Sequence, residues 1–140
     1  MNQGHPVTPN DAYLEFIARR QAPGTTGPIT GTATTTDSST AVDLITIPIS
    51  DGTANFVLVQ IAGYDESVLA DGGGVEKAYY VTRTGSTVSV VDSSTVVGVA
   101  NPPTTSTSTA SASFTVKVQS SFAHPTAWVG SATKLIAAAP

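Results

Sequence analysis

The sequence contains no cysteine and few charged side chains. Charged residues occupy 11% of the 140 positions, well below the roughly 25% of an average soluble domain. Without cysteine, disulfide bonds and thiolate metal sites are excluded. Residues 1–9 lack the basic flank and apolar stretch of a signal peptide, and no apolar run approaches the roughly 18 residues of a membrane helix. We therefore expect a protein made and used in solution, without a membrane partner.

Basic residues are also scarce. Lysine and arginine total six, the formal net charge is −4 and the sequence pI is about 4.8. The six basic residues are scattered between Arg19 and Lys134, so they form no stripe that could follow a phosphate backbone. Nucleic acid is therefore not an expected partner.

Hydroxyl side chains replace the missing charges. The chain has 22 threonines and 15 serines, and threonine favours β-strands. A glycosylated stalk or a disordered linker could have this composition, but the alternating apolar runs at 42–61 and 75–99 argue against both. At this length we expect one domain around one core.

One segment, residues 8–22, has a helical pattern. Thr8 can cap the helix, Pro9 stands at its first position, and the pair Pro23-Gly24 ends it. Residues 24–31 are rich in glycine and proline and predict a flexible connector.

The predicted helix is amphipathic, and its apolar side is a candidate interface. The residues assigned to this interface with a partner are Tyr13, Leu14, Phe16, Ile17 and Arg20. A lone helix of this length is marginal in water, so it must dock on something. Docking on the chain's own sandwich is the alternative. We assign residues 1–29 to an N-terminal arm with linker, and residues 30–140 to a second domain.

The rest of the chain predicts short strands separated by turns. Thr32 to Thr36 reads as an edge strand, Val42 to Ile49 as an edge strand with a bulge after Leu44, and Phe56 to Tyr64 as a central strand. Further strands are expected at 75–83, 87–91, 95–99, 113–120, 128–129 and 134–136, with a surface loop at 101–110. Eight or nine strands predict an all-β fold, an antiparallel β-sandwich that is jelly-roll-like or barrel-like, behind the short α-helical arm.

Large apolar and aromatic residues in these strands are candidates for the oligomer interface or the core. They are Phe56, Leu58, Tyr64, Tyr79 and Trp128. Tyrosine and tryptophan can bury a ring while their polar tip reaches water, which suits either position.

The sequence offers no assembled catalytic or metal site. His5 and His124 lie far apart, and neither has a cysteine or carboxylate at ligand spacing. The acidic loop with Asp65, Glu66 and Asp71 does not match an EF-hand, so a solvated loop is preferred over a Ca²⁺ site. We expect no cofactor, no metal and no enzyme activity.

Residues 30–137 resemble a β-sandwich module common in bacteriophage tail-fibre, baseplate and capsid-decoration proteins. The resemblance rests on Thr34-Thr35-Thr36-Asp37, Leu44 to Pro48, Asp51-Gly52, Val57 to Ile61, Ala78-Tyr79-Tyr80-Val81, Phe114 to Val118 and Trp128. It implies a self-associating, often trimeric, virion sandwich without a cofactor. The arm then suggests a capsid decoration (cement) protein on the outer capsid surface, made in the host cytoplasm and bound to the major capsid protein or another virion protein.

Two alternatives remain open. The first is a short tail fibre, a tail or adaptor component, or a receptor-binding module that makes contact through loops 65–74 and 101–110. The second is a bacterial carbohydrate-binding or adhesin module, which the missing signal peptide and the scarce aromatic residues argue against.

Overall fold

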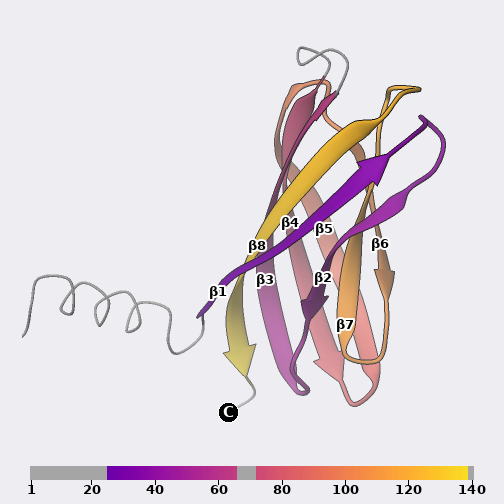
Figure 1. The fold of residues 1–140 in the computed structure, drawn as a ribbon. Helices are drawn as coiled ribbons and strands as arrows, with labels where there is room; N and C mark the ends of the chain where they lie inside the picture. The colour runs from indigo at the N-terminus through magenta and orange to yellow at the C-terminus, as the bar shows by residue number, and fades with distance from the viewer. Residues whose placement is uncertain (1–24, 66–71, 139–140) are drawn as a thin grey trace, which may run out of the picture.

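The computed structural model describes residues 25–65 and 72–138, and every regular element in these ranges is a β-strand (Figure 1). The strands are β1 (Thr25–Thr35), β2 (Val42–Pro48), β3 (Thr53–Asp65), β4 (Gly73–Thr84), β5 (Thr87–Ala100), β6 (Thr104–Thr109), β7 (Ser113–Gln119) and β8 (Thr126–Ala138). They form a five-stranded sheet of order β1-β8-β3-β4-β5 and a three-stranded sheet of order β2-β7-β6. All pairings are antiparallel. The predicted all-β antiparallel sandwich is confirmed.

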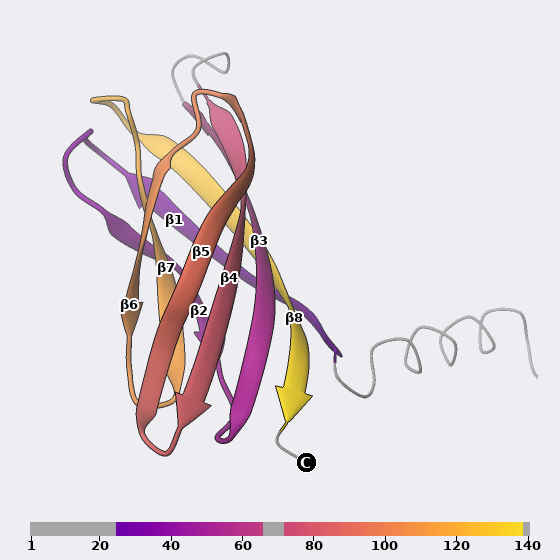
Figure 2. The same ribbon diagram turned by 180° about the vertical axis from the view of Figure 1, so that it is seen from behind.

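The first strands of the described chain pair with strands near its C-terminal end. β1 pairs with β8 and β2 pairs with β7, while β3, β4 and β5 follow one another as a meander (Figure 2). The nested pairs are those of a jelly roll, whereas the meander is not. The fold is therefore jelly-roll-like in one half only.

The predicted helical arm lies outside the described residues. Its candidate interface residues Tyr13, Leu14, Phe16, Ile17 and Arg20 therefore stay predictions. Within the described ranges, no helix is long and apolar enough to cross a membrane.

The core lies between the sheets and is built from alternating residues. The buried apolar side chains of β3 and β7 are Val57, Val59, Ile61, Phe114, Val116 and Val118. Tyr79 of β4 meets Phe114 edge to face, with ring centroids 5.6 Å apart and an interplanar angle of 60°. Since burying a valine or phenylalanine side chain contributes roughly 1.5–3 kcal/mol, these residues hold the sheets together.

β2 contains the predicted bulge and is the predicted edge strand of its sheet. Its register with β7 shifts between Asp43 and Ile45. The extra residue lets both Leu44 and Ile45 be buried, at 4% and 3% exposure, although they are neighbours in the chain.

β1 is an edge strand, as predicted, but it begins at Thr25, inside the segment expected to be a flexible connector. The difference arises because Thr25 and Thr26 already pair with β8. Gly31 has a packing role in the same strand, because a Cβ there would collide with the backbone of Leu44 on the facing sheet. This glycine therefore permits close approach of the two sheets and does not mark a linker. The boundary of the arm itself stays a prediction.

Three further expectations about strands are corrected. β5 is one strand where two were expected, because Asp92, Ser93 and Ser94 pair regularly with β4, and the two register shifts lie on either side of them. β8 is likewise continuous, because every residue from 126 to 138 pairs with β3. Residues 104–109 form β6 instead of a loop, because they pair with β7.

The Asp51-Gly52 turn is present, with Gly52 at a φ of 73°. It joins β2 in one sheet to β3 in the other, so it is a corner of the sandwich and not a hairpin turn.

Candidate interaction surface

One side of the five-stranded sheet is apolar although it faces away from the core. We call it the outer face, the side turned away from the three-stranded sheet. Its exposed large hydrophobic residues on β3, β4 and β8 are Phe56, Tyr64, Tyr80, Val129 and Leu135, with 45–57% of each exposed. Contiguous exposed apolar surface of this kind marks interaction sites more often than isolated hydrophobic residues do.

The first cluster on the outer face is the Phe56 patch, defined as Leu135, Phe56, Tyr80, Leu58 and Ala78. Leu135 and Tyr80 flank Phe56 directly across the sheet, and Ala78 lies opposite Leu58. A depression of about 120 Å³ opens beside Phe56, Ala78 and Tyr80. The patch therefore combines a row of large side chains with a hollow that could receive another.

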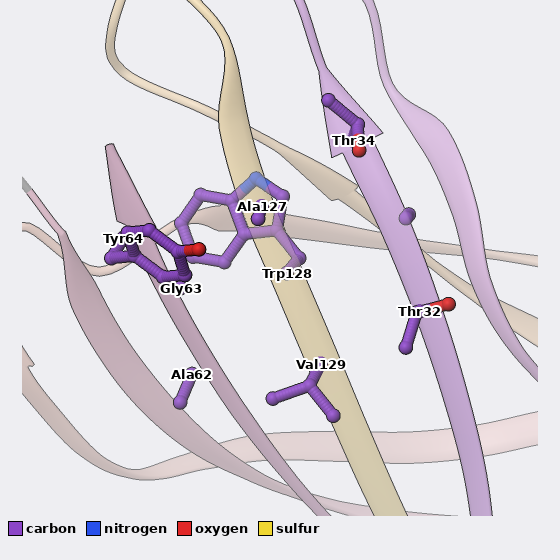
Figure 3. Close-up of a pocket in the computed structure, with 9 residues that line it drawn as sticks. Thr32, Thr34, Ala62, Gly63, Tyr64, Ala127, Trp128 and Val129 are labelled. Carbon is purple, nitrogen blue, oxygen red and sulfur yellow. The ribbon is translucent and has the colours of Figure 1, made fainter. Parts of the chain in front are cut away.

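The second cluster is the Tyr64 patch, defined as Tyr64, Ala62, Val129 and Val99. Ala62 lies opposite Val129, and Gly74 lies between Ala62 and Val99 across the sheet. A groove of about 620 Å³ runs beside Tyr64 and Val129, with the small residues of β3 and β8 in it and the threonines of β1 along its side (Figure 3).

A polar row separates the two patches. The Nε2 atom of Gln60 donates a hydrogen bond of 3.1 Å to Oε2 of Glu76, and Ser131 lies opposite Gln60 on the other side. Glu76 and Asp92 are the charged side chains at outward positions among the described residues of β3, β4, β5 and β8, and both are acidic.

β5 adds exposed valines along the free edge of the same sheet. Val91, Val96, Val97 and Val99 are each exposed by 50–58%. Two register shifts in the β4–β5 pairing leave one extra residue of β5 at each position. Such bulges twist an edge strand and hinder its pairing with another strand.

The five candidate residues for the oligomer interface or core separate into two groups. Phe56, Leu58 and Tyr64 lie on the outer face, whereas Tyr79 and Trp128 are buried in the core. Sequence reasoning missed Tyr80, Val129 and Leu135 as surface residues. Alternation along a strand puts Tyr80 and Val129 on the side opposite their neighbours Tyr79 and Trp128, but it does not tell which member of each pair is exposed. Leu135 lies beside Lys134, a charged residue whose burial the sequence did not indicate.

Trp128 is fixed within the core by one polar contact and one packing contact. Its Nε1 atom donates a hydrogen bond of 2.9 Å to Thr35 Oγ1, and its ring occupies the space where a side chain at Gly63 would lie. Trp128 is therefore a structural residue of this fold.

His124 contacts a buried carboxylate at one end of the sandwich. Its Nδ1 atom lies against Oδ2 of Asp65, which is fully buried at the end of β3, and its ring stacks on Phe122. Ser120 Oγ accepts the backbone N–H of Phe122 at 3.0 Å and lies 3.4 Å from Thr126 Oγ1. These contacts close the 121–125 loop onto the sheet.

At the opposite end of the sandwich, two basic side chains donate hydrogen bonds to backbone carbonyl groups. Lys134 Nζ donates a hydrogen bond of 2.6 Å to the carbonyl of Pro48, and Arg83 Nη1 donates one of 2.9 Å to the carbonyl of Ile49. Burial lowers the pKa of Lys134 because the charged ammonium loses hydration. Both side chains fix the corner between β2 and β3.

The described residues contain no group of three or more histidine, aspartate or glutamate side chains placed to hold a metal ion. Of the acidic loop considered for Ca²⁺, Asp65 contacts His124, while Glu66 and Asp71 lie outside the described residues. His5 lies outside them as well.

Comparisons with known proteins yield structural likenesses alone. No family model and no curated protein matches the chain. The tailspike protein of Acinetobacter phage vB_ApiP_P1 is similar with a TM-score of 0.40 and 14% identity, over 77% of this chain and 22% of that one. Tailspike gp49 of Acinetobacter baumannii bacteriophage Fri1, described as a capsular polysaccharide depolymerase, is similar with a TM-score of 0.40 and 14% identity, over 86% and 21%.

The tailspike protein of Acinetobacter baumannii phage AM24 has a TM-score of 0.39 and 15% identity, over 85% of this chain and 28% of that one. The chain thus spans less than a third of the length of each of these proteins. Likenesses at this level establish no family, so we argue function from the surface of the sandwich.

Proposed function

We propose that the chain is a structural component of a bacteriophage virion, of the tail, short-fibre or adaptor type, whose sandwiches associate with one another through the Tyr64 patch. The class comes from the sequence resemblance to phage β-sandwich modules. The observation that carries the mechanism is the apolar outer face of the five-stranded sheet, where Tyr64 and Val129 are about half exposed.

A tail or fibre role is preferred to capsid decoration for a structural reason. The decoration hypothesis depends on the predicted arm, which lies outside the described residues. The tail-type hypothesis requires that the sandwiches of several copies associate with one another. The Tyr64 patch of the described residues is a surface through which they could do so. Residues 104–109, expected to be part of a receptor-contact loop, are strand β6, so receptor contact through that loop loses its basis.

The chemistry of the Tyr64 patch fits a second copy of this chain. The patch contains no charged side chain, so bringing two copies together creates no like-charge repulsion. Its row across the sheet runs from β1 to β5, about 19 Å at roughly 4.8 Å per strand spacing. Aromatic and aliphatic side chains at the centre of a patch supply most of the binding energy of an interface.

Oligomeric mass tests the association. We expect the full chain to form a homo-oligomer, a trimer by the sequence resemblance, in size-exclusion chromatography with light scattering. Val129→Ser and Val99→Ser should shift it toward monomer. Val91→Ser is the matched control, because Val91 is equally exposed but lies toward the other end of β5. A monomeric full chain at micromolar concentration would contradict the proposal.

The location of the chain in the phage particle tests whether it is a tail component. Gold-labelled antibody against the chain should decorate phage tails in electron micrographs. Labelling over the capsid surface would instead support the decoration hypothesis, and absence of the chain from purified particles would remove the virion assignment.

A further inference from the structure

We propose that residues 8–22 fold back onto the outer face of their own chain and cover the Phe56 patch. This inference goes beyond the proposed function, because it concerns a different patch and a different occupant. Its failure would leave the association through the Tyr64 patch untouched.

The position of β1 brings the segment to this patch. Thr25, the first residue of β1, pairs with Leu135 of β8, and Leu135 pairs with Phe56 of β3. Phe56 in turn pairs with Tyr80 of β4. The chain that precedes Thr25 therefore starts at one end of the row formed by the three exposed side chains of the patch.

The length of the segment matches the row. Fifteen residues in a helix measure about 22 Å at 1.5 Å per residue. The row from β8 to β5 spans three strand spacings, about 14 Å. A helix of this length can cross the whole row after a turn at Pro23-Gly24.

The side chains of the two partners are complementary. The segment carries Tyr13, Leu14, Phe16 and Ile17 on one side, and the patch offers apolar surface with a depression of about 120 Å³ beside Phe56. An aromatic or branched aliphatic side chain inserted there would lose its contact with water.

Tethering favours the segment over a free partner. A covalently linked segment experiences an effective concentration in the millimolar range when its linker is short. Weak contacts therefore suffice to keep it docked, which a separate molecule at micromolar concentration would not achieve.

Limited proteolysis with trypsin on the intact full chain tests the inference. Of the six basic residues, Arg19 and Arg20 lie in the segment, and the other four lie within β4, β7 and β8. Early cleavage therefore reports the segment alone. We expect the full chain to be cut there at least about tenfold more slowly than a synthetic peptide of residues 1–24, since a docked segment must open before cleavage.

Substitutions assign the protection to the patch. Phe56→Ser and Leu135→Ser should raise the cleavage rate toward that of the peptide, and Phe16→Ser within the segment should do the same without touching the sandwich. Val129→Ser, in the Tyr64 patch, is the control that should leave the rate unchanged. Fluorescence of the buried Trp128 identifies any variant that fails to fold.

Two outcomes would overturn the inference. Cleavage of the full chain as fast as the peptide would show that the segment is not docked. Protection that disappears on dilution would show that the segment docks on another copy. The Val129→Ser variant separates this test from the proposed function, because it should change the oligomeric mass without changing the cleavage rate.

Discussion

The indole N–H of Trp128 is hydrogen-bonded to Thr35 Oγ1 at 2.9 Å, across 93 positions of sequence. Both side chains are buried, at 3% and 1% exposure. The bond connects an edge strand to the strand that lies beside it, so it fixes β1 to β8 at the point where the Tyr64 patch lies on the opposite face of the sheet.

Thr35→Val tests the contribution of this bond. Valine keeps the shape of threonine but cannot accept the indole N–H, so a buried donor loses its partner. We expect a loss of about 1–3 kcal/mol in the free energy of unfolding, measured by urea denaturation with tryptophan fluorescence. Thr34→Val, on the exposed side of the same strand, should change it by less than about 0.5 kcal/mol; equal losses would contradict the role of the bond.

Gly63→Ala tests the packing of the Trp128 ring. A methyl group at this position would collide with the ring, and overpacking a core costs roughly 1–3 kcal/mol. Gly98→Ala is the control, because its nearest neighbour is Pro102 Cγ at 3.4 Å. Thermal denaturation should show a lower midpoint for Gly63→Ala than for the control.

Leu44→Ala tests the bulge in β2. Leu44 is buried beneath Gly130 of β8, and truncating a buried leucine costs roughly 2–5 kcal/mol. Ile45→Val, which removes one methyl from the neighbouring buried residue, should cost only roughly 0.5–1.5 kcal/mol. The same denaturation series measures both, and a smaller effect for Leu44→Ala would mean that the bulge does not anchor the two sheets.

Lys134→Met should change the response to alkaline pH. Burial lowers the pKa of Lys134 in the folded chain, so between that pKa and the ordinary lysine value the unfolded chain binds a proton that the folded chain does not. The free energy of unfolding therefore rises with pH in this window, and the rise disappears in Lys134→Met.

Tyr79 acts in the same alkaline range with the opposite sign. Burial raises its pKa, so its contribution to stability falls as pH rises above the ordinary tyrosine value. Because Tyr79 is present in both proteins, the difference between the two pH profiles isolates Lys134. Parallel profiles would show that Lys134 keeps an ordinary pKa in the folded chain.

Strands in which apolar and polar residues alternate could be predicted from the sequence, whereas strands defined only by their pairing could not. The central strand β3 and the bulge at Leu44 follow from the order of apolar residues. β6 alternates threonine and serine and has no apolar face, so only its pairing with β7 defines it as a strand. Ser93 and Ser94 of β5 resemble a turn in the sequence, and only their pairing with Tyr79 and Ala78 of β4 shows that they continue the strand.

The candidate surface could be predicted in part. Alternation placed Phe56 and Leu58 on one side of β3 and valines on the other, and the structure has the same division. For the adjacent pair Tyr79 and Tyr80, sequence could not say which one is exposed. The register that places Tyr80 opposite Phe56 decides it, and such a register depends on residues far apart in the chain.

The strand order also constrains how the chain can fold during synthesis. β8, the last of the described strands, lies between β1 and β3 and pairs with both. Until it leaves the ribosome, β1 has no partner in its sheet and one edge of β3 is open. Since distant pairings of this kind form slowly and leave unpaired strands exposed meanwhile, we expect a nascent chain that is prone to aggregation until β8 is inserted between β1 and β3.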